Sequence, residues 1–349
     1  MEIPTSEISI IETTSVSFTI VIPFRNEEAH LLNLVNSLNA LKFPKDRFEI
    51  IFINDESNDS SIHIINKTIE PSINYTILEN VLRTNSPKKD AITLAISKAK
   101  GTWIVTTDAD CEVPKTWLIE YTKAIKTFDA KMLCAPVSIN DSKGLLSKYQ
   151  QADILSLQGV TMGSFGTGNP LLCNGANLAF EKKAFQLVNG YEGNSHLASG
   201  DDVFMLQKMK AKFPDRVHFL KSNDAIVITQ PVTSWSALIN QRIRWASKTA
   251  KVKHKSSLML GLLVFMVNFL WIIILILGIL AISTWYNAAV FIFLKIVVDA
   301  LFIKKMKLWM GIQLSFLHIL LSGFIYPFIT CFVTIKSQFF NYQWKGRLY

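Results

Sequence analysis

Up to about residue 255, apolar and polar positions alternate in short blocks, and this pattern predicts strands that alternate with helices. Four apolar runs rich in β-branched and aromatic residues predict buried strands at residues 17–23, 48–53, 74–78 and 101–105. Between these runs, apolar residues recur at helical spacing, which predicts helices over residues 26–41 and 59–69 and from Pro87 onward. Strands that alternate with helices indicate a mostly parallel sheet covered on both faces, so we expect an α/β fold.

The pattern continues less regularly over the next hundred residues. It predicts a helix from Pro114 to residue 128, a strand at 132–137, a helix at 141–164 and a strand at 173–180. Three glycines between residues 163 and 168 predict either a loop near a binding site or a flexible turn, and Gly175 is placed for close backbone approach. An amphipathic helix follows Asp201 and Asp202, and the preference for acidic residues in the first turn of a helix accounts for Asp201.

After Ser257 the chain becomes strongly apolar. Residues 258–282 are long enough to span a bilayer, and residues 285–303 predict a second span. The second span carries Lys295 and Asp299, which lie four residues apart and can pair with each other inside the bundle; they are either a functional site or a pair that neutralises itself for packing. Residues 308–335 form a third apolar stretch, either one kinked span or an interfacial helix followed by a span.

The net charge of +9 adds to this picture, because much of the excess lies beside the apolar part. The basic residues there are Arg242, Arg244, Lys248, Lys251, Lys253, Lys255, Lys304, Lys305 and Lys307. Basic residues beside apolar spans indicate a cytoplasmic membrane surface with anionic lipids. Nucleic-acid binding is not expected, since the sequence has neither zinc-finger spacing nor an aromatic and basic sheet signature.

Two carboxylates, Asp108 and Asp110, follow the strand predicted at residues 101–105. At a strand end both can turn toward one point, and Mg²⁺ or Mn²⁺ takes one or two carboxylates with phosphate oxygens completing its shell. The alternative is a solvated turn, because Asp is common after strands. Residues 25–27 and 54–55 also follow strands, and ligands collect at the carboxyl ends of parallel strands, so we expect one site here.

Residues 235–250 predict a helix with two different faces. One face is apolar, and the other carries Gln241, Arg244, Trp245 and Lys248 at helical spacing. Two interpretations stay open. The helix can lie on a membrane with Trp and Arg at the level of the headgroups, or it can offer a guanidinium to a phosphate and an indole face to a sugar.

In order and spacing, these clusters resemble family-two glycosyltransferases with the GT-A fold. The closest resemblance is to the membrane-anchored branch that includes cellulose, chitin and hyaluronan synthases and ceramide glucosyltransferases. The motifs that carry it are VIPFRNEE (21–28), INDES (53–57), TDADC (107–111), CNGANLAF (173–180), SGDD (199–202) and QRIRW (241–245). The resemblance covers roughly residues 17–250 and, in outline, the membrane tail.

This resemblance implies a pocket for a UDP-sugar. Its nucleotide-binding residues would be Pro23, Glu27, Asp55, Lys88 and Asp108. Asp55 would approach the uridine, and Lys88 would face the nucleotide. The sequence departs from the family at Asn54, where an aspartate is commoner, and at Pro87, where a glycine is commoner.

The resemblance also implies how transfer is catalysed. Asp108 and Asp110 would hold Mg²⁺ or Mn²⁺ on the diphosphate, with Asp110 the expected direct ligand. Asp202 would act as the catalytic base that accepts the proton of the attacking hydroxyl. The motif residues Gln241, Arg244 and Trp245 would contact the diphosphate and the acceptor sugar, and Arg244 would neutralise charge on the departing diphosphate together with the cation.

We therefore predict an inverting, metal-dependent hexosyltransferase that moves a sugar from a UDP-sugar to a lipid, lipid-linked or saccharide acceptor. It would be a multi-pass protein of the inner cell membrane with its catalytic domain in the cytoplasm, since the first residues lack the features of a signal peptide. The alternatives are a subunit of a processive polysaccharide synthase and an inactive membrane-anchored protein that binds nucleotide sugars. The predicted domains are a polar tail (1–16), the GT-A domain (17–232), an amphipathic interfacial helix (233–256) and a membrane domain of two to four helices (257–349).

Overall fold

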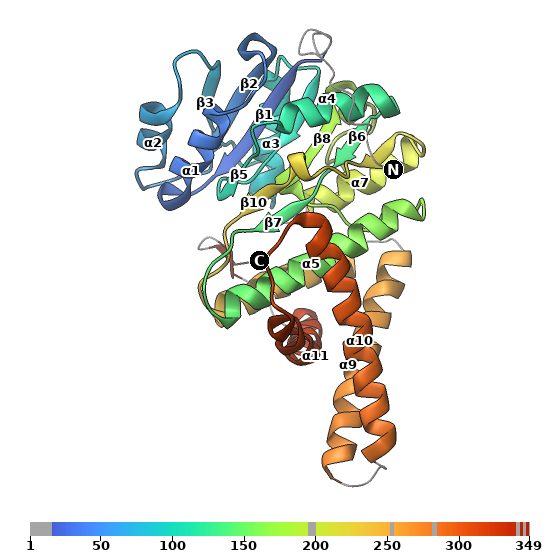
Figure 1. Ribbon diagram of the computed structural model, residues 1–349. Helices are drawn as coiled ribbons and strands as arrows, with labels where there is room; N and C mark the ends of the chain where they lie inside the picture. The colour runs from blue at the N-terminus through green and yellow to red at the C-terminus, as the bar shows by residue number, and fades with distance from the viewer. Residues whose placement is uncertain are drawn as a thin grey trace. The chain divides into compact units, whose positions relative to one another are not determined.

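The computed structural model describes residues 16–194, 200–251, 255–280, 285–339, 343–344 and 347–348. Most of the predicted polar tail lies outside the described residues, as do Ser199 of the SGDD motif and Lys253 of the basic cluster. The chain divides into two compact units. One consists of Met1–Ser138 with Val160–Gln230, and the other of Ile139–Gly159 with Pro231–Tyr349 (Figure 1).

A seven-stranded sheet forms the centre of the first unit, in the order β3-β2-β1-β4-β8-β6-β9. Its strands are β1 (Phe18–Phe24), β2 (Phe48–Asn54), β3 (Tyr75–Glu79), β4 (Trp103–Thr106), β6 (Met132–Cys134), β8 (Leu178–Glu181) and β9 (Val217–Phe219). The first four strands are parallel, and β9 is parallel to β6. Only β8 runs antiparallel to its two neighbours, β4 and β6. The predicted α/β fold with a mostly parallel sheet is confirmed.

Helices cover both faces of this sheet because the side chains of each strand point alternately to either side. On one face, Phe18, Ile20 and Ile22 of β1 pack with α1 (Glu28–Asn39), α2 (Ser61–Thr68) and α4 (Trp117–Phe128). On the other face, Val21 packs with α3 (Pro87–Lys98), α6 (Lys182–Leu187) and α7 (Asp201–Lys212). These two cores hold the strand ends in fixed positions, and the candidate site is built on those ends.

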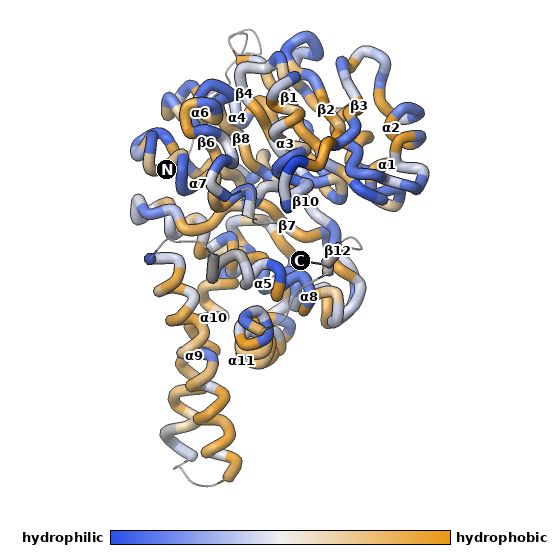
Figure 2. The backbone as a smooth tube through the Cα atoms, turned by 180° about the vertical axis from the view of Figure 1, so that it is seen from behind, coloured by the Kyte–Doolittle hydropathy of each residue, from blue (hydrophilic) through white to orange (hydrophobic). Residues whose placement is uncertain are grey.

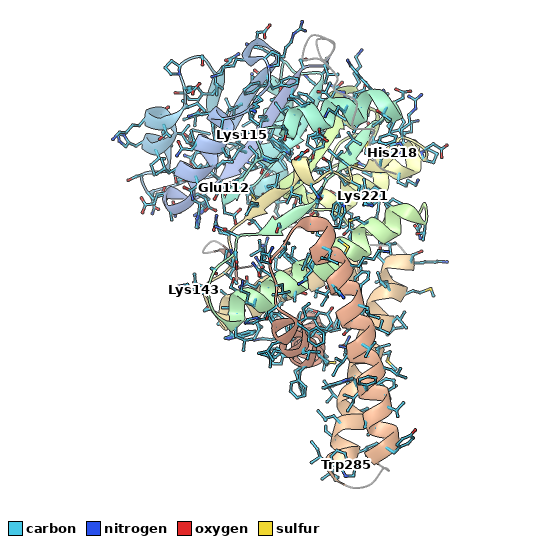
Figure 3. All side chains as sticks on the ribbon, in the orientation of Figure 1. Glu112, Lys115, Lys143, His218, Lys221 and Trp285 are labelled. Carbon is cyan, nitrogen blue, oxygen red and sulfur yellow. The ribbon has the colours of Figure 1, made fainter. Side chains whose placement is uncertain are left out.

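A smaller sheet of three strands, in the order β5-β10-β7, joins β5 (Cys111–Glu112), β10 (Val227–Thr229) and β7 (Val137–Ile139). Glu112, labelled in Figure 3, accepts a hydrogen bond from Gln230 Nε2 at 3.1 Å. The segment that follows Asp108 and Asp110 is thereby held to residues more than a hundred positions later in the chain.

Three sequence predictions about these elements were wrong. The strand predicted at 132–137 is two strands in different sheets, because Pro136 has no N–H and its carbonyl turns to accept from Val227 N at 3.2 Å. The loop predicted at 163–168 is mostly helix, since α5 (Leu145–Gly166) continues through Gly163 and only Gly168 has a positive φ, of +74°. The strand predicted at 173–180 begins at Leu178, after a 3₁₀ turn over Gly175–Asn177.

The second unit contains the first part of α5 and the helices α8 (Trp235–Lys251), α9 (Lys255–Ile279), α10 (Trp285–Met310) and α11 (Phe316–Phe339). Among the described residues, α9 and α11 are the two helices long and apolar enough to cross a membrane. Figure 2 shows α9 and α10 as hydrophobic along most of their length. The predicted pair is present in α10, where Lys295 Nζ lies 2.6 Å from Asp299 Oδ2. The third apolar stretch is divided at Gly311, and α11 is one helix with Pro327 inside it.

Candidate active site

Asp55 follows β2 and is held by three neighbouring groups. Its N–H donates to Phe24 O at 2.9 Å, and its Oδ1 accepts from Asn80 Nδ2 at 2.8 Å. Arg25 Nη1 donates to the backbone oxygen of Asp55 at 3.0 Å and lies 3.9 Å from its Oδ2. With 11% of its side chain exposed, Asp55 is a fixed carboxylate at the carboxyl end of the sheet.

Asn54 has a structural role that an aspartate could not fill. Its Nδ2 donates to Glu79 Oε2 at 2.8 Å, and its Oδ1 accepts from Ser57 N at 2.9 Å. An aspartate here would present a second carboxylate to Glu79 and would repel it. The departure from the family at this position is therefore explained by the neighbouring strand β3.

The loop between β1 and α1 is strained where it meets the end of β2. Asn26 and Glu56 have positive φ angles of 51° and 60°, which non-glycine residues rarely adopt. Asn26 N donates to Ser57 Oγ at 3.0 Å, Asn58 N donates to Asn26 Oδ1 at 2.9 Å, and Glu27 N donates to Ser61 Oγ at 3.0 Å. Strain of this kind, held in place by surrounding bonds, clusters at binding sites. Of the predicted pocket residues, Pro23 and Glu27 belong to this loop region, and Pro23 is half-buried at the end of β1.

Lys88 forms ion pairs with acidic side chains at the end of β4 and at the start of α7. It stands in the first turn of α3, directly after Pro87, and its Nζ lies 2.6 Å from Asp108 Oδ1 and 3.6 Å from Asp201 Oδ2. Burial disfavours the ammonium, but the charges of Asp108 and Asp201 outweigh it and hold the pKa of Lys88 above its ordinary value. Lys88 is therefore a charged lysine at all physiological pH values.

The two aspartates at the start of α7 face a turn from another part of the chain. Gly175 N donates to Asp202 Oδ2 at 3.3 Å, and Val203 N donates to Asp202 Oδ1 at 2.8 Å. A Cβ on Gly175 would lie 3.1 Å from Asp201 Oδ2, so this glycine is approached closely by side chains rather than by the backbone segment that was predicted. Asp201 lies in the first helical turn as predicted, but its buried carboxylate also pairs with Lys88, and the sequence did not predict that contact.

The candidate cation ligands Asp108 and Asp110 are both partly exposed. Within the described part of the chain, no group of three His, Cys, Asp or Glu side chains is placed to hold a metal ion. Two carboxylates fit Mg²⁺ or Mn²⁺ when phosphate and water oxygens complete the shell. Burial and the charges of Asp110 and Asp108 raise the pKa of the Cys111 thiol well above its ordinary value.

The QxxRW motif lies on α8, in the second unit. Here the sequence prediction for Arg242 was wrong, since it is a buried side chain and not part of an exposed basic surface. Its Nε donates to Asp153 Oδ2 of α5 at 2.6 Å, and its Nη1 donates to Gln241 Oε1 at 2.7 Å. Its guanidinium carbon lies 4.1 Å from the centre of the Trp245 ring. Arg242 thus contacts the side chains of Gln241 and Trp245, two of the three motif residues. The side chain of Lys248 lies outside the described residues.

Comparison with known proteins finds a family similar to the N-terminal half of the chain. Residues 19–187 match the family described as Glycosyl transferase family 2. These residues are therefore similar to family-two glycosyltransferase domains. The match includes Asp55, Lys88, Asp108 and Asp110 and ends before Asp202 and the QxxRW motif.

Two curated relatives are similar over long segments. The chain is 24% identical over 371 residues to the "Probable glycosyltransferase YdaM" of Bacillus subtilis, covering 94% of this chain and 85% of that protein. It is 24% identical over 239 residues to the "Beta-monoglucosyldiacylglycerol synthase" of Synechocystis, covering 65% of this chain and 46% of that protein.

A solved structure with a similar fold is the mannosyltransferase PcManGT from Pyrobaculum calidifontis, in complex with GDP-Man and Mn²⁺. Its TM-score is 0.54 at 15% identity, and the alignment covers 93% of this chain and 87% of that one. The predicted GT-A-like fold and the predicted enzyme class, a glycosyltransferase, are confirmed. The placement in the branch with cellulose and chitin synthases stays a prediction, as do the roles of the individual site residues.

Proposed function

We propose that this protein transfers a sugar from a UDP-sugar to a lipid or lipid-linked acceptor at a membrane surface, with Mg²⁺ or Mn²⁺ and with inversion at the anomeric carbon. The observation that carries the proposal is that Lys88, which pairs with Asp108 at the carboxyl end of β4, meets Asp202 at Gly175, in a chain whose residues 19–187 match Glycosyl transferase family 2. Ligands of parallel α/β sheets bind at such ends.

The donor nucleotide would bind beside Asp55. Its carboxylate is fixed by Asn80 and Arg25, so it can accept hydrogen bonds from a base without reordering. Pro23 and Glu27 would line the same pocket, next to the strained loop. The choice of uracil over another base rests on the family resemblance, since the structure with GDP-Man and Mn²⁺ has the same fold.

The diphosphate would lie toward Asp108, Asp110 and Lys88. A divalent cation held by the two aspartates would neutralise the charge that grows on the departing diphosphate. Lys88, in the first turn of α3, would supply a further positive charge on the protein side.

Asp202 would be the catalytic base. The backbone N–H groups of Gly175 and Val203 orient its carboxylate, and the half-buried side chain stays open to an incoming hydroxyl. An oriented carboxylate within reach of the acceptor hydroxyl is the geometry that general-base catalysis requires. The roles proposed for Gln241, Arg244 and Trp245, in binding diphosphate and acceptor, rest on the motif alone.

A lipid acceptor is supported by the membrane helices and by one relative. Large apolar side chains are exposed along α9, α10 and α11, which is unfavourable in water and expected in a bilayer. The Synechocystis relative is named for the synthesis of a glucosylated diacylglycerol. We propose a multi-pass protein with its catalytic domain on the cytoplasmic side, as the basic residues next to α9 and at the end of α10 favour.

Nucleotide release from a panel of UDP-, GDP- and CDP-sugars tests the donor and the cation. The protein would be purified in detergent and assayed with Mg²⁺, with Mn²⁺ and with EDTA, beside Asp110→Ala and a control, Asp224→Ala, in the exposed 3₁₀ turn Asn223–Ala225. We expect metal-dependent release from one UDP-sugar, lost in Asp110→Ala and kept in the control. Metal-independent release, or equal release by both variants, would contradict the proposal.

A further inference from the structure

The contact between Lys88 and Asp108 has a consequence for cation binding. Lys88 Nζ lies 2.6 Å from Asp108 Oδ1, within the first unit. The ammonium therefore forms an ion pair with a carboxylate that is a candidate cation ligand. Only 19% of the Lys88 side chain is exposed, compared with 39% of the Asp108 side chain. The side chain of Lys88 is thus mostly buried, whereas that of Asp108 is more accessible to solvent.

A divalent cation and this ammonium cannot share the same oxygen favourably. Mg²⁺ lies about 2.1 Å from a ligand oxygen, so a cation on Asp108 Oδ1 would stand within roughly 5 Å of the ammonium. Like charges at that separation repel strongly where water is partly excluded. Either Lys88 or the cation can be the close partner of this oxygen, and binding one weakens binding of the other.

A second carboxylate, that of Asp201, lies close to the Lys88 ammonium. Asp201 Oδ2 lies 3.6 Å from its Nζ, and this carboxylate is buried and fixed at the start of α7. A small movement of the ammonium away from Asp108 would keep it beside Asp201. From there it could also reach a phosphate oxygen brought in by a nucleotide.

We propose that Lys88 is an exchangeable counter-ion of Asp108: it occupies this carboxylate when no nucleotide is bound, and it moves onto the diphosphate when donor and cation bind together. The inference rests on the proposed function for the identity of the diphosphate. It makes cation binding conditional on the nucleotide, since no group of three His, Cys, Asp or Glu side chains among the described residues is placed to hold a metal ion, and Asp108 is already paired. The same exchange would favour nucleoside diphosphates over ligands without a phosphate.

Mn²⁺ binding to the full-length protein in detergent tests this exchange without any turnover. Free Mn²⁺ would be measured by electron paramagnetic resonance, with and without UDP, for the wild type, Lys88→Gln and Lys88→Arg. A matched control is Lys123→Gln. Lys123 pairs with Glu120 at 2.7 Å with 20% of its side chain exposed, almost as Lys88 pairs with Asp108, but on α4.

Without UDP, we expect Lys88→Gln to bind Mn²⁺ roughly tenfold more tightly than the wild type, because the competing charge is gone. Lys88→Arg and Lys123→Gln should bind Mn²⁺ as the wild type does, and Lys88→Gln/Asp108→Asn should lose the gain. UDP should tighten Mn²⁺ binding to the wild type more than to Lys88→Gln.

Unchanged or weaker Mn²⁺ binding by a folded Lys88→Gln protein without UDP would overturn the exchange, and circular dichroism would establish that the variant is folded. The outcome is separable from that of the donor assay. A protein that releases UDP from a sugar but shows no gain in Lys88→Gln would contradict only the exchange. A gain in Lys88→Gln with no turnover of any donor would support the exchange and contradict the proposed function.

Discussion

At the scale of single residues, the site depends on how closely Gly175 approaches the start of α7. Its N–H binds Asp202, and a Cβ in its place would stand 3.1 Å from Asp201 Oδ2 and 3.6 Å from Lys88 Nζ. One residue without a side chain thus lets two carboxylates and an ammonium gather in one place. Asp108 and Asp202 could be found from the sequence because each lies in a recognisable motif, and Lys88 because the family resemblance implies a basic residue there. The pairing of Asp201 with Lys88 could not, since it joins residues more than a hundred positions apart through the fold alone.

We predict that Gly175→Ala lowers the rate of sugar transfer by roughly tenfold or more, because the added methyl group pushes Asp201 and Lys88 from their positions and misplaced catalytic groups lose rate steeply. The melting temperature should change little, since the far end of a side chain can move. Gly163→Ala is the control: a Cβ there meets nothing within 4 Å. Transfer at the wild-type rate by Gly175→Ala would show that this close approach is not needed.

At the scale of secondary-structure elements, helical and strand periodicity predicted most of the first unit, because buried faces repeat along each element. The periodicity did not show where β6 ends and β7 begins, since that break depends on Pro136 and on a partner strand far along the chain. The distribution of charge was also misleading for Arg242, because the sequence shows it as one of several basic residues before the apolar part. Its partner Asp153 lies 89 residues earlier on α5, and only the folded second unit brings them together.

The pair of Arg242 and Asp153 is expected to be important for stability. The two side chains are 10% and 7% exposed, so Asp153→Asn or Arg242→Gln would leave one charge buried without its partner. We predict a loss of about 3–5 kcal/mol in the free energy of unfolding, measured by denaturant titration in detergent. Arg216→Gln removes an exposed pair with Asp129 and should cost no more than about 1 kcal/mol. Equal effects of Asp153→Asn and Arg216→Gln would contradict this assignment.

At the scale of the whole molecule, a glycosyltransferase domain and a set of apolar helices are joined in one chain. Composition alone separated these parts, because the change in hydropathy after Ser257 is abrupt. The number of spans was harder to predict: α10 is a long helix, but it carries Lys295, Asp299 and three lysines near its end and is not one of the two membrane-crossing candidates among the described residues. Charge inside an apolar helix leaves its depth in the membrane dependent on its neighbours.

The most direct test of the account separates donor binding from transfer in Asp202→Asn. Donor binding would be measured by titration calorimetry with Mn²⁺, and transfer by incorporation of labelled sugar into an extract of membrane lipids, beside the wild type and the control Asp224→Asn. We predict donor affinity unchanged from the wild type and transfer lower by roughly 10²–10⁴-fold, because the carboxamide cannot accept the proton. Transfer at the wild-type rate, or loss of donor binding together with transfer, would contradict the assignment of Asp202 as the catalytic base.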